Sequence, residues 1–212
     1  LQDCAVVVWA VKPQTFRDAA ALTQAYTRNA LHLSVAAGIR SDTLAQWLHS
    51  ERIVRAMPNT PALVGLGQTG LFARSAVTPA DRLWVQQVLG STGACMWLAQ
   101  ESQLDAVTAL SGSGPAYVFY FMEAMVEAGV EMGLDAAQAR QLALATFVGA
   151  SALAQASSEP LATLRERVTS KGGTTYAALT AMQASGLKPQ FKAAMQAARQ
   201  RASELGAEFG AA

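Results

Sequence analysis

The sequence has few residues of the kinds that build metal sites and disulfide frameworks. Among its 212 residues there are two cysteines and two histidines. Cys4 and Cys95 are too few for a disulfide framework, which predicts free thiols and a cytoplasmic protein. His32 and His49 are isolated from each other and from the cysteines along the chain, so no metal-ligand spacing is present. We therefore expect no metal site.

Charge is also scarce. Charged residues make up 15% of the chain, hydrophobic residues make up 51%, and the formal net charge is +1. This balance gives no electrostatic reason to expect a nucleic-acid or membrane partner. The apolar run at residues 5–11 is too short to span a bilayer, and no basic segment of a signal peptide precedes it. Such a high apolar content instead predicts extra buried surface in an oligomer.

Strand-like and helix-like segments alternate through the first half of the chain. A continuous apolar run rich in β-branched residues, such as residues 4–11, is typical of a strand buried on both faces of a parallel sheet. The alternation predicts a doubly wound α/β sheet, with Ser41 or Asp42 capping one helix. The predicted strands are residues 4–11, 31–36, 53–57, 68–73 and 95–98, and the predicted helices are 15–26, 41–48 and 79–89.

After about residue 99 the sequence becomes alanine-rich and helical in pattern. We therefore expect a sheet domain over residues 1–99 and an all-α domain over 100–212. The segment 115–132 is apolar on nearly every face, which predicts a helix buried in a subunit interface. The expected helices are residues 101–109, 115–132, 135–156, 160–168, 174–184 and 189–205.

The segment 165–175 has the composition of an anion-binding turn. Gly172 and Gly173 allow positive φ and a close approach of the backbone to a ligand. Thr174 and Thr175 are suited to cap the following helix, whose unpaired N–H groups attract a carboxylate or phosphate. An ordinary helix–turn–helix connection explains this segment equally well. Its positive charges are Arg165, Arg167 and Lys171.

A second small-residue segment, Leu-Ser-Gly-Ser-Gly-Pro at residues 110–115, opens the long apolar helix. Pro115 suits a first helical position, and Ser113 is a candidate cap. Two further segments, Arg-Ala-Met-Pro-Asn-Thr-Pro at 55–61 and Val-Trp-Ala-Val-Lys-Pro-Gln at 8–14, follow apolar runs. With these four segments the chain resembles the pyrroline-5-carboxylate reductases from about residue 6 to about 205. Lys171 departs from the pattern, because that family usually has proline there.

The resemblance implies that the chain reduces Δ1-pyrroline-5-carboxylate to L-proline with NADPH or NADH. Thr175 is then the catalytic candidate, hydrogen-bonded to the ring nitrogen of the substrate. The resemblance also implies homodimers, assembled further into decamers in many members. The substrate-binding candidates are Ser111, Gly112, Ser113, Gly114, Pro115, Ser170, Gly172, Gly173, Thr174 and Thr175.

The glycine-rich turn that opens a dinucleotide-binding domain is absent from the sequence. The resemblance agrees, and implies that the first β-α-β portion of the Rossmann domain is missing. Cofactor contacts are still expected at the carboxyl ends of the strands, although ordinary strand-to-helix turns use the same residue types. The cofactor-binding candidates are Ala10, Val11, Lys12, Pro13, Ala36, Ala37, Gly38 and Asn59.

Two other functions compete with this interpretation. The β-hydroxyacid dehydrogenases also pair a Rossmann domain with a helical one, but they use a lysine on the long helix, and residues 115–132 contain none. A non-catalytic oligomeric binding protein, descended from a reductase, is the alternative from a different class. The missing glycine-rich turn and Lys171 motivate that alternative.

Overall fold

The computed structural model describes residues 4–210, which form two compact units. The first unit extends to Pro115 and takes up the chain again from Met195, and the second is Ala116–Ala194. Both boundaries between the units lie inside long helices. The boundary expected between residues 99 and 100 stays a prediction.

The first unit contains a five-stranded sheet whose strands lie side by side in chain order. Strands β1 to β3 are parallel to one another, β4 is antiparallel to β3, and β5 is parallel to β4. The predicted α/β sheet is therefore confirmed, and it is mostly parallel. The strands are β1 (Val6–Trp9), β2 (Leu31–Ser34), β3 (Ile53–Met57), β4 (Gly67–Ala73) and β5 (Gly93–Trp97).

The antiparallel pairing of β4 departs from the Rossmann-like parallel sheet that the sequence predicted. Residues 58–66 join β3 to β4 and contain only the short 3₁₀ helix η1 (Thr60–Val64). A parallel crossover needs roughly a dozen or more residues, usually with a full helix. This connection is too short, so the chain turns back and pairs antiparallel.

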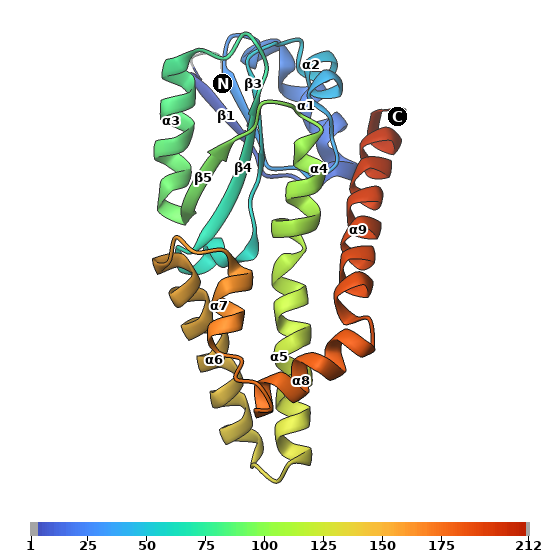
Figure 1. Cartoon of the computed structure of the whole chain (residues 1–212). Helices are drawn as coiled ribbons and strands as arrows, with labels where there is room; N and C mark the ends of the chain where they lie inside the picture. Colours follow the sequence, from blue (N-terminus) through green and yellow to red (C-terminus); the bar gives the residue numbers. More distant parts are fainter. Residues whose placement is uncertain (1–3, 211–212) are drawn as a thin grey trace. The chain divides into compact units, whose positions relative to one another are not determined.

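The helices of the first unit cover both faces of the sheet (Figure 1). Helices α1 (Pro13–Thr27) and α2 (Ser41–Leu48) cross over between the parallel strands and pack on one face, where Phe16 and Ile39 are fully buried. Helix α3 (Pro79–Leu89) packs on the other face, where Leu33 and Val85 are fully buried. The 3₁₀ turn η2 (Gly90–Thr92) leads from α3 into β5. The sheet is therefore the middle layer of three.

Local sequence explains why these helices begin where they do. Pro13 and Pro79 occupy the first positions of α1 and α3, where a missing N–H costs nothing. Thr78 and Asp81 form a reciprocal capping box at the start of α3. The predicted cap of α2 is different, because its N-cap residue is Arg40 and Ser41 is already the first helical residue.

The rest of the described chain is helical, as predicted after residue 99. The helix α4 is followed directly by η3, a five-residue stretch of π-helix, and then by α5. Helices α5 to α9 match the predicted helical segments closely. Their bounds are α4 (Gln103–Val107), η3 (Thr108–Gly112), α5 (Gly114–Glu131), α6 (Ala136–Ala156), α7 (Leu161–Arg167), α8 (Thr174–Ala184) and α9 (Leu187–Gly210).

The second unit has almost no apolar core of its own. Of its residues, only Gly129, Ala139 and Ala143 are buried. Tyr117, Phe121 and Phe191 form one small cluster of edge-to-face aromatic contacts. Many large apolar side chains of α5 and α6 are exposed, including those of Phe119, Tyr120, Leu142, Leu144, Val148 and Leu153. A unit of this kind needs another surface to cover it.

Helix α5, predicted to be buried in a subunit interface, is largely exposed in the single chain, so its burial between subunits stays a prediction. Its acidic residues Glu123, Glu127 and Glu131 are exposed, and no ion pair to them occurs among residues 4–210. In the single chain these three carboxylates, spaced four residues apart, form an exposed acidic row along α5.

Candidate active site

The cofactor candidates gather at one edge of the sheet in the first unit. Strands β1, β2 and β3 are adjacent and parallel, so the loops after them leave from the same edge. A hydrogen bond of 3.1 Å from the N–H of Val35 to the carbonyl of Trp9 ties two of these strand ends together. Residues 10–13 follow β1, residues 36–38 follow β2, and Asn59 follows β3.

Gly38 has a structural reason of its own to be glycine. Its φ is +81°, a left-handed conformation that disfavours other residues. An added Cβ would also lie 3.1 to 3.2 Å from side-chain atoms of Phe209 and Leu205, on the C-terminal part of α9 that belongs to this unit. The turn and the packing against α9 together account for Gly38 without any ligand.

Asn59 connects the sheet edge to the first substrate segment. Its side-chain Nδ2 donates to the Oγ of Ser111 at 3.0 Å. Its Oδ1 accepts from the backbone N–H of Gln68, at the start of β4, at 2.9 Å. The structure thus brings a candidate cofactor residue and a candidate substrate residue into direct contact, although they lie 52 positions apart.

The Ser-Gly-Ser-Gly-Pro segment is helical, which differs from the predicted capped turn: Ser111 and Gly112 end the π-helix η3, and Gly114 and Pro115 begin α5. Ser113 has helical φ and ψ angles, and its N–H donates to the carbonyl of Thr108 at 2.8 Å, five residues back. Ser113 is therefore not a cap, and Pro115 is the second residue of α5. π-Helical stretches inside α-helices occur frequently at functional sites.

The second substrate segment is the loop between α7 and α8. The N–H of Gly173 donates to the carbonyl of Ser170 at 3.0 Å, which closes a four-residue turn. Gly172 has a φ of +76°, whereas Gly173 is extended, and an added Cβ at Gly173 would lie 3.2 Å from the carbonyl oxygen of Ser170. Thr174 and Thr175 are the first two residues of α8, and the N-cap is Gly173, so neither threonine caps the helix as predicted.

This turn leaves donors free for a ligand. The amides of Thr174 and Thr175 precede the first intrahelical hydrogen bond of α8, which runs from Ala177 to Gly173. The amide of Gly173 is already engaged by Ser170. Thr175 is half-buried, and its hydroxyl has no hydrogen-bond partner within the described residues. The turn therefore presents free backbone donors, among them the amides of Thr174 and Thr175, together with the hydroxyl of Thr175.

Most of the positive charge beside this turn is neutralised locally. Arg165 lies 3.8 Å from a carboxylate oxygen of Glu166, and Arg167 lies 2.7 Å from one of Glu159. Lys171 is exposed and has no charged partner among the side chains that the structure describes. Lys171 is thus the cation of this segment that remains available.

The substrate candidates divide between the two units. Ser111 to Pro115 lie in the first unit, with the sheet edge, and Ser170 to Thr175 lie in the second. Within residues 4–210 no three acidic, histidine or cysteine side chains are grouped to hold a metal ion. In the same residues, no helix is long and apolar enough to cross a membrane.

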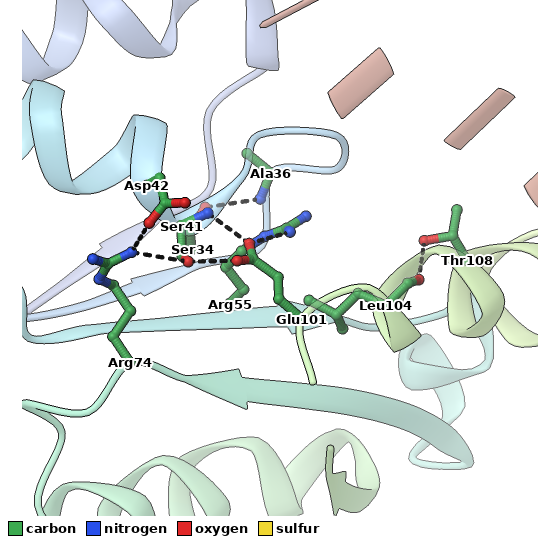
Figure 2. A network of polar contacts seen from close by, with 9 residues as sticks. All are labelled: Ser34, Ala36, Ser41, Asp42, Arg55, Arg74, Glu101, Leu104 and Thr108. Atoms are coloured by element: carbon green, nitrogen blue, oxygen red, sulfur yellow. Dashed lines mark hydrogen bonds and ion pairs between the residues drawn. The ribbon is translucent and has the colours of Figure 1, made fainter. Parts of the chain in front are cut away.

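A polar network next to the sheet edge was missed from sequence. The carboxylate of Glu101 accepts hydrogen bonds from Ser41 and from Arg55 of β3, and Arg74 extends the network to Ser41 and Asp42 (Figure 2). Arg55 is only 8% exposed. An arginine inside an apolar strand requires a buried partner, and this was the available signal.

The charge of Glu101 is held by its surroundings. Burial raises the pKa of this carboxyl, but the hydrogen bonds from Ser41 and the ion pair with Arg55 outweigh it. The net effect is a pKa below the ordinary value for glutamate. The group is therefore an ionised structural tie between α2, β3 and the segment that leads into α4.

Known proteins resemble the chain over nearly its whole length. A family model described as pyrroline-5-carboxylate reductase dimerisation matches residues 101–205. A pyrroline-5-carboxylate reductase of Pseudomonas aeruginosa is 45% identical over 98% of this chain and 77% of its own length. The chain belongs to the pyrroline-5-carboxylate reductase family. A relative from Pisum sativum is 40% identical over 94% of this chain and 73% of its own length.

Solved structures of pyrroline-5-carboxylate reductases have the same fold. The enzyme of Coxiella burnetii is 37% identical and superposes with a TM-score of 0.89, covering 96% of this chain and 77% of its own. That of Plasmodium falciparum, solved with NADP bound, is 31% identical with a TM-score of 0.89, covering 95% of this chain and 81% of its own. The predicted resemblance and fold class are confirmed.

Proposed function

We propose that this protein reduces Δ1-pyrroline-5-carboxylate to L-proline by hydride transfer from NADPH or NADH, the last step of proline biosynthesis. The observation that carries the proposal is the contact of Asn59 with Ser111, in a chain of this reductase family. It joins the strand ends, where α/β sheets bind dinucleotides, to the first predicted substrate segment. The relatives favour this oxidoreductase over a non-catalytic binding protein.

The sheet edge fits a nicotinamide dinucleotide. Ala37 after β2 and Lys12 after β1 are exposed, and the small side chains of residues 36–38 leave room for a ligand at these strand ends. When bound, the cofactor supplies the hydride that reduces the carbon–nitrogen double bond. We assign its binding to Ala10, Val11, Lys12, Pro13, Ala36, Ala37 and Gly38. Asn59, which the resemblance grouped with them, contacts the candidate substrate residue Ser111 instead.

The substrate carboxylate needs hydrogen-bond donors. The free amides of Thr174 and Thr175, at the first turn of α8, and the hydroxyl of Ser170 provide them. Gly172 shapes the turn. The Ser111–Pro115 segment lines the substrate pocket and supplies further hydrogen-bond donors. The assigned substrate-binding residues are Ser111, Gly112, Ser113, Gly114, Pro115, Ser170, Gly172, Gly173, Thr174 and Thr175.

We assign to Thr175 the contact with the ring nitrogen of the substrate. A neutral hydroxyl can accept a hydrogen bond from a protonated imine and donate one to the amine that forms. This versatility suits a nitrogen whose protonation changes during the reaction. Solvent supplies the proton, so no histidine is required. The half-buried hydroxyl of Thr175, which no described residue engages, supports the assignment.

We further propose a homodimer, with decamers as a larger assembly, and a cytoplasmic location. The match to the dimerisation family and the exposed apolar side chains of α5 and α6 support the dimer. The free thiols of Cys4 and Cys95 support the location. The same family match, over residues 101–205, supports a dimerisation and substrate part over 100–212, and we propose that residues 1–99 are the remainder of the dinucleotide-binding part.

The test of the proposal is steady-state oxidation of NADPH with Δ1-pyrroline-5-carboxylate. We expect turnover by the purified protein, a loss of about tenfold or more in kcat for Thr175→Val, and recovery of most activity in Thr175→Ser. Thr180→Val is the matched control, because the Thr180 hydroxyl on the same helix already donates to the carbonyl of Tyr176 at 2.8 Å. Absence of imine-dependent oxidation by the unaltered protein would refute the function.

A further inference from the structure

We propose that Asn59 is a positioning residue, which holds the hydroxyl of Ser111 so that its proton is directed at the carboxylate of the cyclic imino acid. The inference rests on the proposed function, since it concerns the same substrate. It assigns Asn59 to the substrate side of the site, whereas the resemblance grouped it with the cofactor residues.

The orientation of the Asn59 amide is fixed by the backbone. The N–H of Gln68 can only donate, so the Asn59 atom that lies 2.9 Å from it must be the carbonyl oxygen. The NH₂ group therefore faces Ser111, with Nδ2 at 3.0 Å from Oγ. An NH₂ group has no acceptor capacity, so Ser111 must accept this hydrogen bond.

The hydroxyl proton of Ser111 is consequently free to be donated to a ligand. Within the described residues its oxygen accepts from Asn59, and no acceptor for its proton is present. Several helical hydroxyls elsewhere in the chain behave differently. Those of Thr108, Thr146 and Thr180 each donate to the carbonyl four residues back, at 2.8 Å. Ser111 is thus a half-buried donor that makes no hydrogen bond to a carbonyl group of its own helix.

Rigid elements hold both partners of this contact. Asn59 directly follows β3 and is the N-cap residue of η1, and its bond to Gln68 ties it to β4. Ser111 lies in the π-helix η3, where the next residue, Gly112, is so close to Met57 that an added Cβ would lie 2.5 Å from its Cε. The hydroxyl is therefore oriented before a ligand arrives, which lowers the ordering cost of binding.

A carboxylate is the ligand that matches such a donor. A hydrogen bond to an ionised oxygen is stronger than a neutral one, and an acceptor-only group cannot compete with Asn59 for the Ser111 oxygen. Substrate and product both carry a carboxylate on a five-membered ring. The contribution of Ser111 should then be seen in substrate binding rather than in cofactor binding.

Asn59→Asp reverses the polarity of the contact with little change of shape. The carboxylate still accepts from Gln68 and can now accept from Ser111, which turns the hydroxyl proton away from the substrate. We expect Ser111→Ala and Asn59→Asp each to raise the KM for Δ1-pyrroline-5-carboxylate about tenfold, with the KM for NADPH and the melting temperature nearly unchanged. The double variant should be no worse than Ser111→Ala alone.

Matched measurements separate the alternatives. Asn29→Asp, at the only other asparagine in the chain, adds the same charge at an exposed position and should leave both KM values unchanged. If Asn59→Asp fails to fold, Asn59→Ala takes its place in the comparison of single and double variants, because Asn59→Ala also removes the donor to Ser111. Calorimetric titration with L-proline gives a second readout, and its Kd should rise by the same factor.

Several results would overturn the inference. A further loss when an Asn59 substitution is added to Ser111→Ala would mean that Asn59 acts on the substrate without Ser111. A rise in the KM for NADPH alone would make Asn59 a cofactor ligand. An unchanged substrate KM in Ser111→Ala would remove the hydroxyl from the site while leaving the reductase function intact. Absence of turnover in the unaltered protein would instead defeat the function, and the inference with it.

Discussion

Glu101 takes the place of a capping side chain for Ser41, 60 positions away in sequence. Its two carboxylate oxygens accept from the backbone N–H and from the hydroxyl of Ser41, each at 2.6 Å. Ser41 begins α2, whose N-cap residue, Arg40, has no side-chain hydrogen bond to the helix. A negative charge at this end of a helix also opposes the positive end of its dipole. The contact anchors α2 to the segment before α4.

Removing the charge of Glu101 should therefore destabilise the first unit. We expect Glu101→Gln to lower the free energy of unfolding by about 2 kcal/mol, because Arg55 is left buried without an ionised partner and the helix N-terminus loses its anion. Urea denaturation followed by circular dichroism measures this loss. Glu123→Gln, at an exposed carboxylate of α5, is the control and should change the stability by less than about 0.5 kcal/mol. Equal losses in both variants would contradict the assigned role.

The stabilising effect of Glu101 should also depend on pH in a defined direction. Its pKa is depressed in the folded protein from an ordinary value of 4.5, so the unfolded chain takes up its proton first as the pH falls. The stability from this group is present above about pH 4.5 and is lost as the pH drops through the folded pKa. Unfolding free energies of the protein and of Glu101→Gln should therefore converge below pH 4.5. A constant difference would show that the carboxylate is not the titrating group.

His32 should produce a second acid-sensitive range at higher pH. The ring is fully buried in β2, with Nδ1 accepting from Nε1 of Trp9 at 3.0 Å and Nε2 3.0 Å from the carbonyl of Thr27. Burial lowers the pKa of His32 to about 4 from 6.5. The unfolded chain therefore binds a proton between these values while the folded protein does not. Stability should fall as the pH decreases from 6.5 to 4, by about 3 kcal/mol in total.

Replacing the two histidines in turn checks this prediction. His32→Gln should flatten the decline in unfolding free energy between pH 6.5 and 4.5, whatever its effect on stability at neutral pH. His49→Gln, at an exposed histidine after α2, should keep the decline of the unaltered protein. An identical slope in His32→Gln would mean that other groups cause the acid sensitivity.

The sequence allowed the order and type of nearly all elements to be predicted, because hydrophobic period and turn residues are local signals. The features that it missed depend on contacts between distant segments. Nothing near Glu101 in the sequence indicates that its carboxylate accepts hydrogen bonds from Ser41. The direction of β4 follows from the length of the loop before it. The π-helix at Ser111 reads as an ordinary glycine-serine turn, since its geometry depends on the helices on both sides.

The residue at position 171, in the second substrate turn, should influence the stability of the protein. The turn closes with the hydrogen bond from Gly173 to Ser170, and the φ of Gly172 is +76°, as at the third position of a type II turn. Lys171 then holds the second position, where proline is favoured. We expect Lys171→Pro to stabilise the protein by roughly 0.5–1 kcal/mol, by restricting the unfolded chain, and to raise the melting temperature by about 1–4 °C. Lys171→Gln separates the loss of charge from this effect and should leave the melting temperature unchanged.

The proposed dimer should depend on the apolar surface of α5 and α6, since the described part of the second unit has almost no apolar core of its own. Phe119 is 64% exposed and Val148 is 62% exposed in the single chain. We expect Phe119→Arg and Val148→Glu each to shift the protein from dimer to monomer in light scattering at micromolar concentration, because a buried unpaired charge costs several kcal/mol in an interface. The melting temperature of the unaltered protein should rise with its concentration, as for folding coupled to association, and this dependence should disappear in both variants. Leu83→Lys, at an exposed leucine of α3 in the sheet unit, is the control and should remain dimeric. Dissociation by Leu83→Lys, with intact dimers of the other two variants, would place the interface on the sheet unit instead.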